Sequence, residues 1–232
     1  MDEQTALKKK AGEFAADLIE SGMRIGLGTG STAIWAVRRI GERIKSGELT
    51  DIVAIPTSIR TQEEAESLGI PLGSFDEIDE LDVTIDGADE VDGRLNVIKG
   101  GGGALLREKI VAQMTKRLVI IVDPSKQVSL LGQTWAVPIE VVHFGWESQK
   151  RFLESEGATV EVRQDEDGNP YLTDGGNLIL DANFGRIYNI LALETKLQNR
   201  VGIVESGLFF EMVDDLIIAS PDGIQHVQGR IA

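Results

Sequence analysis

The sequence predicts an α/β protein with a Rossmann-like open, mostly parallel sheet covered by helices on both faces, and an inserted smaller ferredoxin-like α+β lobe. Two observations predict this class. Up to residue 126, short apolar runs alternate with amphipathic segments, as in strands joined by crossover helices. Between residues 137 and 204 the order becomes strand, helix, strand, strand, helix, strand, which is typical of a ferredoxin-like unit. We therefore expect a main domain, 1–130 and 205–232, and a small lobe, 131–204.

The main domain is expected to open with an amphipathic helix, because apolar residues recur at helical spacing from Leu7 to Ile19. Ser58 is a suitable N-cap for a helix that runs to Leu68, and Gly69 is a suitable stop. Strands are predicted at 24–27, 52–55, 81–85 and 118–122, and further helices at 31–45 and 104–114.

In the lobe we expect strands at 137–142, 159–163, 177–181 and 201–204, with helices at 146–156 and 187–197. A turn-rich hairpin surrounds residues 167–170, because Asp, Gly, Asn and Pro all favour turns. The last apolar segments, 216–219 and 224–227, are expected to return to the main sheet.

Composition excludes several classes of function. The 232 residues include 38 acidic and 23 basic ones, a net charge of -15, which disfavours nucleic acid and anionic membranes as partners. The absence of cysteine excludes disulfides and zinc–sulfur sites, and two histidines make a histidine-rich metal centre improbable. No apolar run is long enough to span a bilayer, and the acidic start is unlike a secretory leader. We expect a cytoplasmic protein without membrane or nucleic-acid partners.

A glycine-rich loop follows the first predicted strand, with the sequence Gly28-Thr29-Gly30-Ser31-Thr32. At a strand-to-helix junction, the N–H groups of the helix start and the three hydroxyls can cradle a phosphate. The loop also matches a loose dinucleotide fingerprint, but the second strand ends in residues 55–58 without the acid that a nicotinamide enzyme needs. No Gly-Lys dipeptide occurs, which excludes a P-loop. The alternative is a plain connector.

An acidic segment, residues 86–92, comes after the strand predicted at 81–85. That strand delivers Asp86 and Asp89 to the carboxyl edge of the sheet, where open α/β folds bind ligands. Clustered carboxylates can bind sugar hydroxyls, move protons or hold a divalent metal. Away from a strand end, a solvated acidic surface is the usual reading of such a segment. We assign no function to Glu90 or Asp92.

Four consecutive glycines, residues 100–103, lie between Lys99 and a helix that carries Glu108. Bare backbone N–H groups at a helix start can face an anion or a developing oxyanion, and Lys99 can stabilise the same negative charge. A buried Glu108 is suited to proton transfer. The alternative is a flexible loop followed by a solvated helix. Lys126, after the strand 118–122, is expected at the same edge, and Lys8 can add positive charge near the phosphate.

Four stretches together resemble ribose-5-phosphate isomerase of the A type, along essentially the whole chain. They are Gly28-Thr29-Gly30-Ser31-Thr32, Asp86-Gly87-Ala88-Asp89-Glu90, Lys99-Gly100-Gly101-Gly102 with Arg107-Glu108-Lys109, and Asp123-Pro124-Ser125-Lys126-Gln127. Each motif is weakly specific, whereas their order and spacing together are highly specific.

The resemblance implies a metal-independent, cofactor-free isomerase that interconverts ribose 5-phosphate and ribulose 5-phosphate through an enediolate. By this likeness Glu108 is the general base, Asp86 assists ring opening and proton movement, and Lys99 stabilises the oxyanion. The remaining substrate contacts implied are Thr29, Gly30, Ser31, Thr32, Gly87, Ala88, Asp89, Gly100, Gly101, Gly102 and Lys126, to which Lys8 is added from its charge. The family is usually a homodimer or a homotetramer.

Two other classes of function remain to be weighed. A non-catalytic sugar-phosphate sensor would normally carry a basic DNA-binding segment, which the charge argues against. A nicotinamide oxidoreductase is opposed by the missing acid after the second strand.

Overall fold

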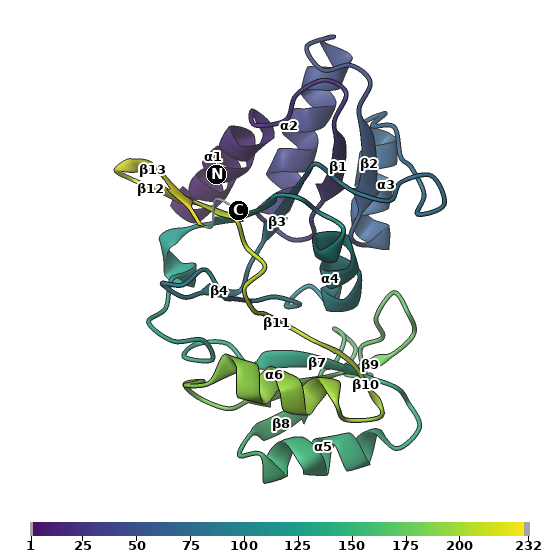
Figure 1. The fold of residues 1–232 in the computed structure, drawn as a ribbon, viewed down its shortest axis with the longest axis vertical. Coiled ribbons are helices and arrows are strands. Elements are labelled where there is room, and N and C mark those ends of the chain that lie inside the picture. The colour runs from purple at the N-terminus through teal and green to yellow at the C-terminus, as the bar shows by residue number, and fades with distance from the viewer. Residues whose placement is uncertain (1, 230–232) are drawn as a thin grey trace. The chain divides into compact units, whose positions relative to one another are not determined.

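The chain divides into two units in the computed structural model, which describes residues 2–229 (Figure 1). Among those residues, the first unit contains 2–88, 107–126 and 212–229, and the second contains 89–106 and 127–211. The second unit includes the range of the predicted lobe, 131–204, and adds residues 89–106, 127–130 and 205–211 to it.

The first unit is built on a six-stranded sheet with the order β13-β12-β6-β3-β1-β2. Neighbouring strands from β12 to β2 are parallel, and only the edge strand β13 is antiparallel to its neighbour. The strands are β1 (Arg24–Leu27), β2 (Val53–Pro56), β3 (Val83–Gly87), β6 (Leu118–Val122), β12 (Asp215–Ser220) and β13 (Gly223–Gln228). The predicted mostly parallel sheet and the return of the last segment to it are confirmed.

Helices cover both faces of this sheet. The helices are α1 (Glu3–Ala16), α2 (Ala33–Lys45), α3 (Ile59–Ser67) and α4 (Leu105–Gln113). Ala54 of β2 shares a buried apolar cluster with residues of α1, α2 and α3, whereas the next residue, Ile55, shares another with Val111 of α4. Because successive strand residues point to opposite faces, α4 covers the face that the other three helices leave open. Ser58 caps α3 as expected, accepting from the N–H of Thr61.

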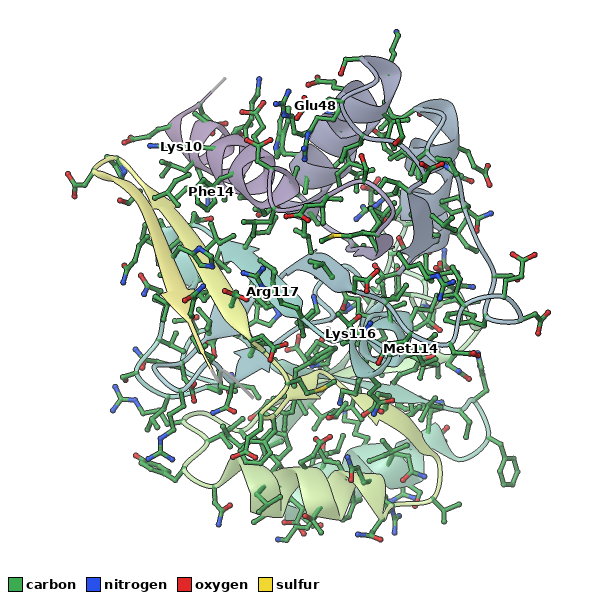
Figure 2. All side chains as sticks on the ribbon, turned by 45° about the horizontal axis from the view of Figure 1, so that its top comes forward. Lys10, Phe14, Glu48, Met114, Lys116 and Arg117 are labelled. Carbon is green, nitrogen blue, oxygen red and sulfur yellow. The ribbon has the colours of Figure 1, made fainter. Side chains whose placement is uncertain are left out.

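The first helix ends earlier than the apolar pattern suggests. Helix α1 stops at Ala16, so Leu18 and Ile19 lie outside it. Ile19 is nevertheless only 1% exposed and belongs to the same apolar cluster, because the chain turns while its apolar side chains stay packed. Phe14, labelled in Figure 2, contacts the ring of His226 on β13 edge to face at 6.1 Å, which links α1 to the edge hairpin.

The second unit contains a four-stranded antiparallel sheet with the order β10-β7-β9-β8. Its elements are β7 (Val137–Val141), α5 (Trp146–Ser155), β8 (Thr159–Val162), β9 (Leu178–Asn183), α6 (Ile190–Gln198) and β10 (Ile203–Ser206). The order strand–helix–strand–strand–helix–strand, with the first strand between the third and the fourth, is the ferredoxin-like topology that the sequence predicts. Helix α6 begins three residues later than expected, at Ile190, because Asn189 caps it by accepting from the N–H of Ala192.

Side chains alternate across the small sheet. Ile139 of β7 and Leu180 of β9 pack in one apolar cluster with Leu153 of α5. Their strand neighbours Glu140 and Asp181 project from the opposite face, because side chains in a strand alternate with a period of two. The helices therefore cover one face, and Glu140 and Asp181 lie on the other.

The second unit also contains a small three-stranded sheet, which was not predicted from the sequence. It joins β4 (Glu90–Val91), β5 (Val97–Ile98) and β11 (Leu208–Phe209) in the order β11-β5-β4. Strands of two residues are too short to show an alternating pattern, so periodicity cannot reveal them. Its strand β5 ends at Ile98, immediately before Lys99.

Candidate active site

The glycine-rich loop of the first unit is shaped by the carboxylate at the end of β3. A Cβ atom at Gly28 would lie 2.3 Å from Oδ1 of Asp86, so only glycine fits at this position. Oδ1 of Asp86 accepts hydrogen bonds from the N–H groups of Thr29, at 3.0 Å, and Gly87, at 2.7 Å. Gly30 has a φ of +119°, which other residues rarely adopt. The loop and Asp86 are thus brought together at the carboxyl end of β3.

The hydroxyl of Thr29 points into the protein. Its Oγ1 lies 2.7 Å from Oγ1 of Thr57, donates to Oγ of Ser58 at 2.8 Å and lies 3.1 Å from Oγ1 of Thr61. All four residues are buried. This hydroxyl cluster ties the loop to the start of α3, which differs from the ligand-facing Thr29 hydroxyl expected from the sequence. The partners lie about thirty residues away in the sequence, so no local pattern could reveal them.

Ser31 and Lys8 form the exposed side of the same loop. Nζ of Lys8 on α1 donates to Oγ of Ser31 at 3.1 Å. Thr32 occupies the N-cap position of α2, but its side chain does not accept a helix N–H. A cation, a hydroxyl and the start of a thirteen-residue helix therefore lie together, and this combination attracts an anion.

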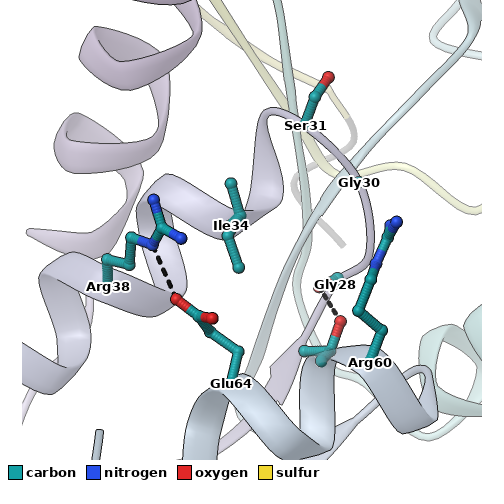
Figure 3. A pocket seen from close by; sticks show the side chains of 8 residues that line it. Gly28, Gly30, Ser31, Ile34, Arg38, Arg60 and Glu64 are labelled. Atoms are coloured by element: carbon teal, nitrogen blue, oxygen red, sulfur yellow. Dashed lines mark hydrogen bonds and ion pairs between the residues drawn. The ribbon is translucent and has the colours of Figure 1, made fainter. Parts of the chain in front are cut away.

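A cavity of about 310 Å³ lies beside the loop (Figure 3). Figure 3 shows Arg60 extending from α3 toward the loop between Gly28 and Gly30. On the opposite wall Arg38 donates to Glu64 at 2.7 Å, so its charge is already balanced. Arg60 was not predicted from the sequence, although its position in the first turn of α3, two residues after the Ser58 cap, was a usable signal.

Lys126 lies at the same edge of the main sheet as Asp86. It ends a short 3₁₀ turn, η1 (Pro124–Lys126), directly after β6, which pairs with β3 in parallel. Asp123 stabilises this turn by accepting from the N–H and the hydroxyl of Ser125, at 2.9 and 2.5 Å. Lys126 itself is half-buried.

Glu108 lies in the first turn of α4 and is buried, with 4% of its surface exposed. Its neighbour Lys109 is also buried, at 3%. A carboxylate of an ordinary charged helix face would be solvated, so burial excludes the solvated-helix interpretation for this turn.

In the second unit, Lys99 and the glycine strip, residues 100–103, follow the small sheet. Lys99 is 2% exposed; its N–H donates to the carbonyl of Gly207 at 2.9 Å, and its Nζ lies 5.6 Å from the ring centroid of Phe209. Asp89 accepts from the N–H of Gly101 at 2.7 Å on its Oδ2. The structure therefore brings Asp89 to the glycine strip.

Two acids that follow Asp89 have structural roles. Glu90 is fully buried and accepts the N–H groups of Gly132, Thr134 and Trp135, at 2.6, 2.5 and 2.8 Å. Asp92 accepts the N–H groups of residues 94 and 96, which closes the turn between β4 and β5. These hydrogen bonds account for the two acids as structural residues, so neither Glu90 nor Asp92 needs a ligand to explain its place in the acidic segment.

Within residues 2–229, no cluster of three or more His, Asp or Glu side chains has an arrangement that could hold a metal ion. None of the helices in that range has both the length and the apolar composition needed to cross a bilayer.

Relatives of known name resemble the chain over almost its whole length. A family model described as ribose 5-phosphate isomerase A (phosphoriboisomerase A) matches residues 53–223. Ribose-5-phosphate isomerase A of Chloroflexus aurantiacus is 53% identical over 220 residues, which cover 95% of this chain and 92% of that protein. The protein of the same name from Desulfatibacillum aliphaticivorans is 53% identical over 228 residues, with coverage of 98% and 99%.

Solved structures agree. Ribose 5-phosphate isomerase from Plasmodium falciparum is 41% identical with a TM-score of 0.94, covering 97% of this chain and 99% of that one. A D-ribose-5-phosphate isomerase in complex with phospho-erythronic acid is 39% identical with a TM-score of 0.95, covering 98% and 100%. From the family model, these identities and the shared fold, we conclude that this chain belongs to the ribose 5-phosphate isomerase A family.

Proposed function

We propose that this protein interconverts D-ribose 5-phosphate and D-ribulose 5-phosphate, as an aldose–ketose isomerase of the non-oxidative pentose phosphate pathway. The observation that carries the proposal is family membership along nearly the whole chain, at 53% identity to relatives named ribose-5-phosphate isomerase A. The homodimer or homotetramer and the cytoplasmic location implied by the resemblance stay predictions. Size-exclusion chromatography with light scattering would measure the first of these.

The phosphate group of the substrate is assigned to the loop 28–32. The pair of Lys8 and Ser31 and the start of α2 support this assignment, because together they provide a cation, a hydroxyl and helix N–H groups. We add Arg60 as a candidate contact, since a guanidinium is well suited to phosphate oxygens. Thr29 contributes by holding the loop in place.

The chemical step moves one proton between two carbons. In the proposed mechanism Glu108 removes the proton from C2 of the open-chain aldose, which gives an enediolate, and returns it to C1 to give the ketose. The burial of Glu108 supports this role, because the carboxylate is withdrawn from bulk water and is not part of a solvated helix face. Asp86 moves the proton between the two oxygens, and Asp89 binds a hydroxyl beside it.

Negative charge on the enediolate oxygen needs a stabilising partner. We assign this task to Lys99, assisted by the N–H groups of Gly100 and Gly102, whereas the N–H of Gly101 donates to Asp89. The near-complete burial of Lys99 supports the assignment, because an ammonium group in a site of low dielectric acts more strongly on a nearby charge. Gly87 and Ala88 have no polar or bulky side chain, so their backbone groups allow close approach of a sugar.

The test is a direct assay with ribose 5-phosphate in the presence of EDTA. We expect ketose to form at the same rate with and without the chelator, and product made in heavy water to carry deuterium at C1. Absence of ketose, or loss of activity with EDTA, would contradict the proposal. NADH binding measured by fluorescence would instead favour an oxidoreductase.

A further inference from the structure

Arg163 of the small lobe binds the glycine strip. It follows β8 directly, and its Nη1 donates to the carbonyl of Gly100 at 2.7 Å and to the carbonyl of Gly101 at 3.2 Å. The contact joins residues more than sixty positions apart within the second unit. Two successive backbone carbonyls therefore converge on one nitrogen atom.

Asp181 fixes the orientation of this arginine. Its carboxylate accepts from Nε of Arg163 at 2.9 Å and from Nη2 at 2.5 Å. Two parallel bonds hold the guanidinium in one plane, and the arginine side chain is only 14% exposed. Asp181 projects from the polar face of the small sheet, on the side opposite the apolar cluster of Leu180. The rigid sheet thereby determines where Nη1 lies.

Because the peptide bond is planar, the hydrogen bonds from Arg163 to the carbonyls also fix the direction of the N–H groups that follow them. In a planar trans peptide the carbonyl oxygen and the following N–H point in opposite directions. Because the carbonyls of Gly100 and Gly101 point at Arg163, the N–H groups of Gly101 and Gly102 point the other way. The N–H of Gly101 points away from Arg163, because it donates to Oδ2 of Asp89 at 2.7 Å. Arg163 and Asp89 thus bind opposite sides of the strip.

Tyr171 supports the far end of the strip. Its N–H donates to the carbonyl of Arg163 at 2.8 Å, so both residues belong to one hairpin. A Cβ atom at Gly103 would lie 2.2 Å from the Tyr171 hydroxyl, and the hydroxyl lies 3.4 Å from the carbonyl oxygen of Gly102. A strip of four glycines has many accessible conformations, and these contacts select one.

We propose that Arg163, held by Asp181, is a positioning residue that keeps the N–H of Gly102 directed at the enediolate oxygen, while the N–H of Gly101 stays on Asp89. The proposal rests on the function proposed above. Without the arginine the carbonyls of Gly100 and Gly101 lose the hydrogen bonds that fix their direction, and a carbonyl oxygen can then turn toward the developing negative charge. An amide donor at this position stabilises the negative charge mainly in the transition state. Removal of Arg163 should therefore lower kcat and leave KM nearly unchanged.

The experiment compares Arg163→Ala, Arg163→Lys and Asp181→Asn with the unmodified enzyme and with Arg200→Ala. Arg200 is a matched control, because it is a partly buried arginine of the same unit that bonds Gln149 and Ser148 instead of the strip. For each variant kcat, KM and the midpoint of thermal unfolding are measured. For Arg163→Ala, kcat is also measured with added ethylguanidinium.

We expect Arg163→Ala to lower kcat by about thirty- to a hundredfold, with KM within about threefold of the unmodified enzyme. Arg163→Lys restores only part of kcat, because an ammonium group cannot bind Asp181 in two places and also reach both carbonyls. Asp181→Asn lowers kcat less, and Arg200→Ala leaves it unchanged. Ethylguanidinium raises kcat of Arg163→Ala several-fold and has no effect on the control.

Three outcomes would overturn the proposal. The first is a wild-type kcat in folded Arg163→Ala. The second is a fall in kcat that matches the loss of folded protein and is not rescued by ethylguanidinium. If Arg163→Ala does not fold, wild-type kcat in Arg163→Lys and Asp181→Asn is the third. If the unmodified enzyme itself forms no ketose, the proposed function fails together with this proposal. If only the variants behave against expectation, the proposed function stands and the role of Arg163 alone is refuted.

Discussion

The N–H of Thr29 donates to Oδ1 of Asp86 across 3.0 Å, which connects the loop after β1 to the carboxylate at the end of β3. The two residues are 57 positions apart, and both are buried. The bond fixes the loop 28–32, which we propose binds the phosphate, against a proposed catalytic acid. Changes at either residue are therefore expected to affect both loop geometry and chemistry.

Replacing Gly28 with alanine should disrupt this arrangement. The new Cβ would lie 2.3 Å from Oδ1 of Asp86 and 2.5 Å from its backbone Cα, so strand ends must move apart. We expect the free energy of unfolding to fall by about 1–3 kcal/mol, measured by urea denaturation, and activity to fall with it. Gly93→Ala is the control, because a Cβ there has nothing within 4 Å. Equal stability of the two variants would contradict the steric argument.

Replacing Glu108 with glutamine tests the general base. The amide keeps the shape of the buried side chain but cannot accept the proton, so kcat should fall by roughly a hundredfold or more. Substrate affinity and the thermal midpoint should change little. Glu63→Gln, at an exposed position of α3, should leave kcat unaltered. Near-normal turnover of the first variant would remove Glu108 from the mechanism.

Replacing Lys8 with alanine tests the phosphate end. The variant removes a cation that donates to Ser31 at the loop, so KM for ribose 5-phosphate should rise about tenfold while kcat stays close to normal. Lys10, labelled in Figure 2, is exposed on the same helix, and Lys10→Ala should have no effect on KM. Equal KM values for the two variants would exclude Lys8 from phosphate binding.

The pH dependence of stability should reveal the buried cluster around Asp215. Burial alone would raise the pKa of this carboxyl group, but hydrogen bonds from Arg117, labelled in Figure 2, and His226 outweigh it and hold the pKa below its ordinary value of 3.8. The unfolded state therefore binds more protons near that pH, so the stabilisation is present above about pH 4 and is lost on acidification.

Asp215→Asn should accordingly be less stable than the unmodified protein at pH 7, by about 1–3 kcal/mol, because two charged hydrogen bonds at 2.6 Å are weakened. The difference should shrink as the pH falls below about 3.8. Urea denaturation at several pH values measures it, with the exposed Asp222→Asn as control. A difference that does not change with pH would show that the carboxyl group is not stabilised by its charge.

Much of the architecture could be predicted because its signals are local. The strand Leu118–Val122 is an apolar run between Arg117 and Asp123, and the short strand Arg24–Leu27 runs into a glycine-rich loop; the structure places both as expected. The cap at Ser58 depends on a side chain and an N–H three residues apart. The ferredoxin-like order of the lobe follows from the succession of such local elements.

Other features depend on partners that are distant in the sequence. In the sequence Glu90 is one acid among several in an acidic segment. The fold places the loop at residues 132–135 beside it, and Glu90 there accepts hydrogen bonds from backbone N–H groups as a buried structural residue. The Thr29 hydroxyl joins a buried cluster only when β1 and α3 are adjacent. Arg163 reaches the glycine strip only once β8 and β9 are paired.

The sequence by itself thus determined the elements of the two larger sheets, their order and the residue types available for chemistry, because apolar periodicity, turn residues and caps act over a few positions. Only the tertiary structure decided which polar groups meet, which of them are buried and which face a ligand. The physical reason is that a hydrogen bond depends on distance and direction in space, and neither is encoded in spacing along the chain.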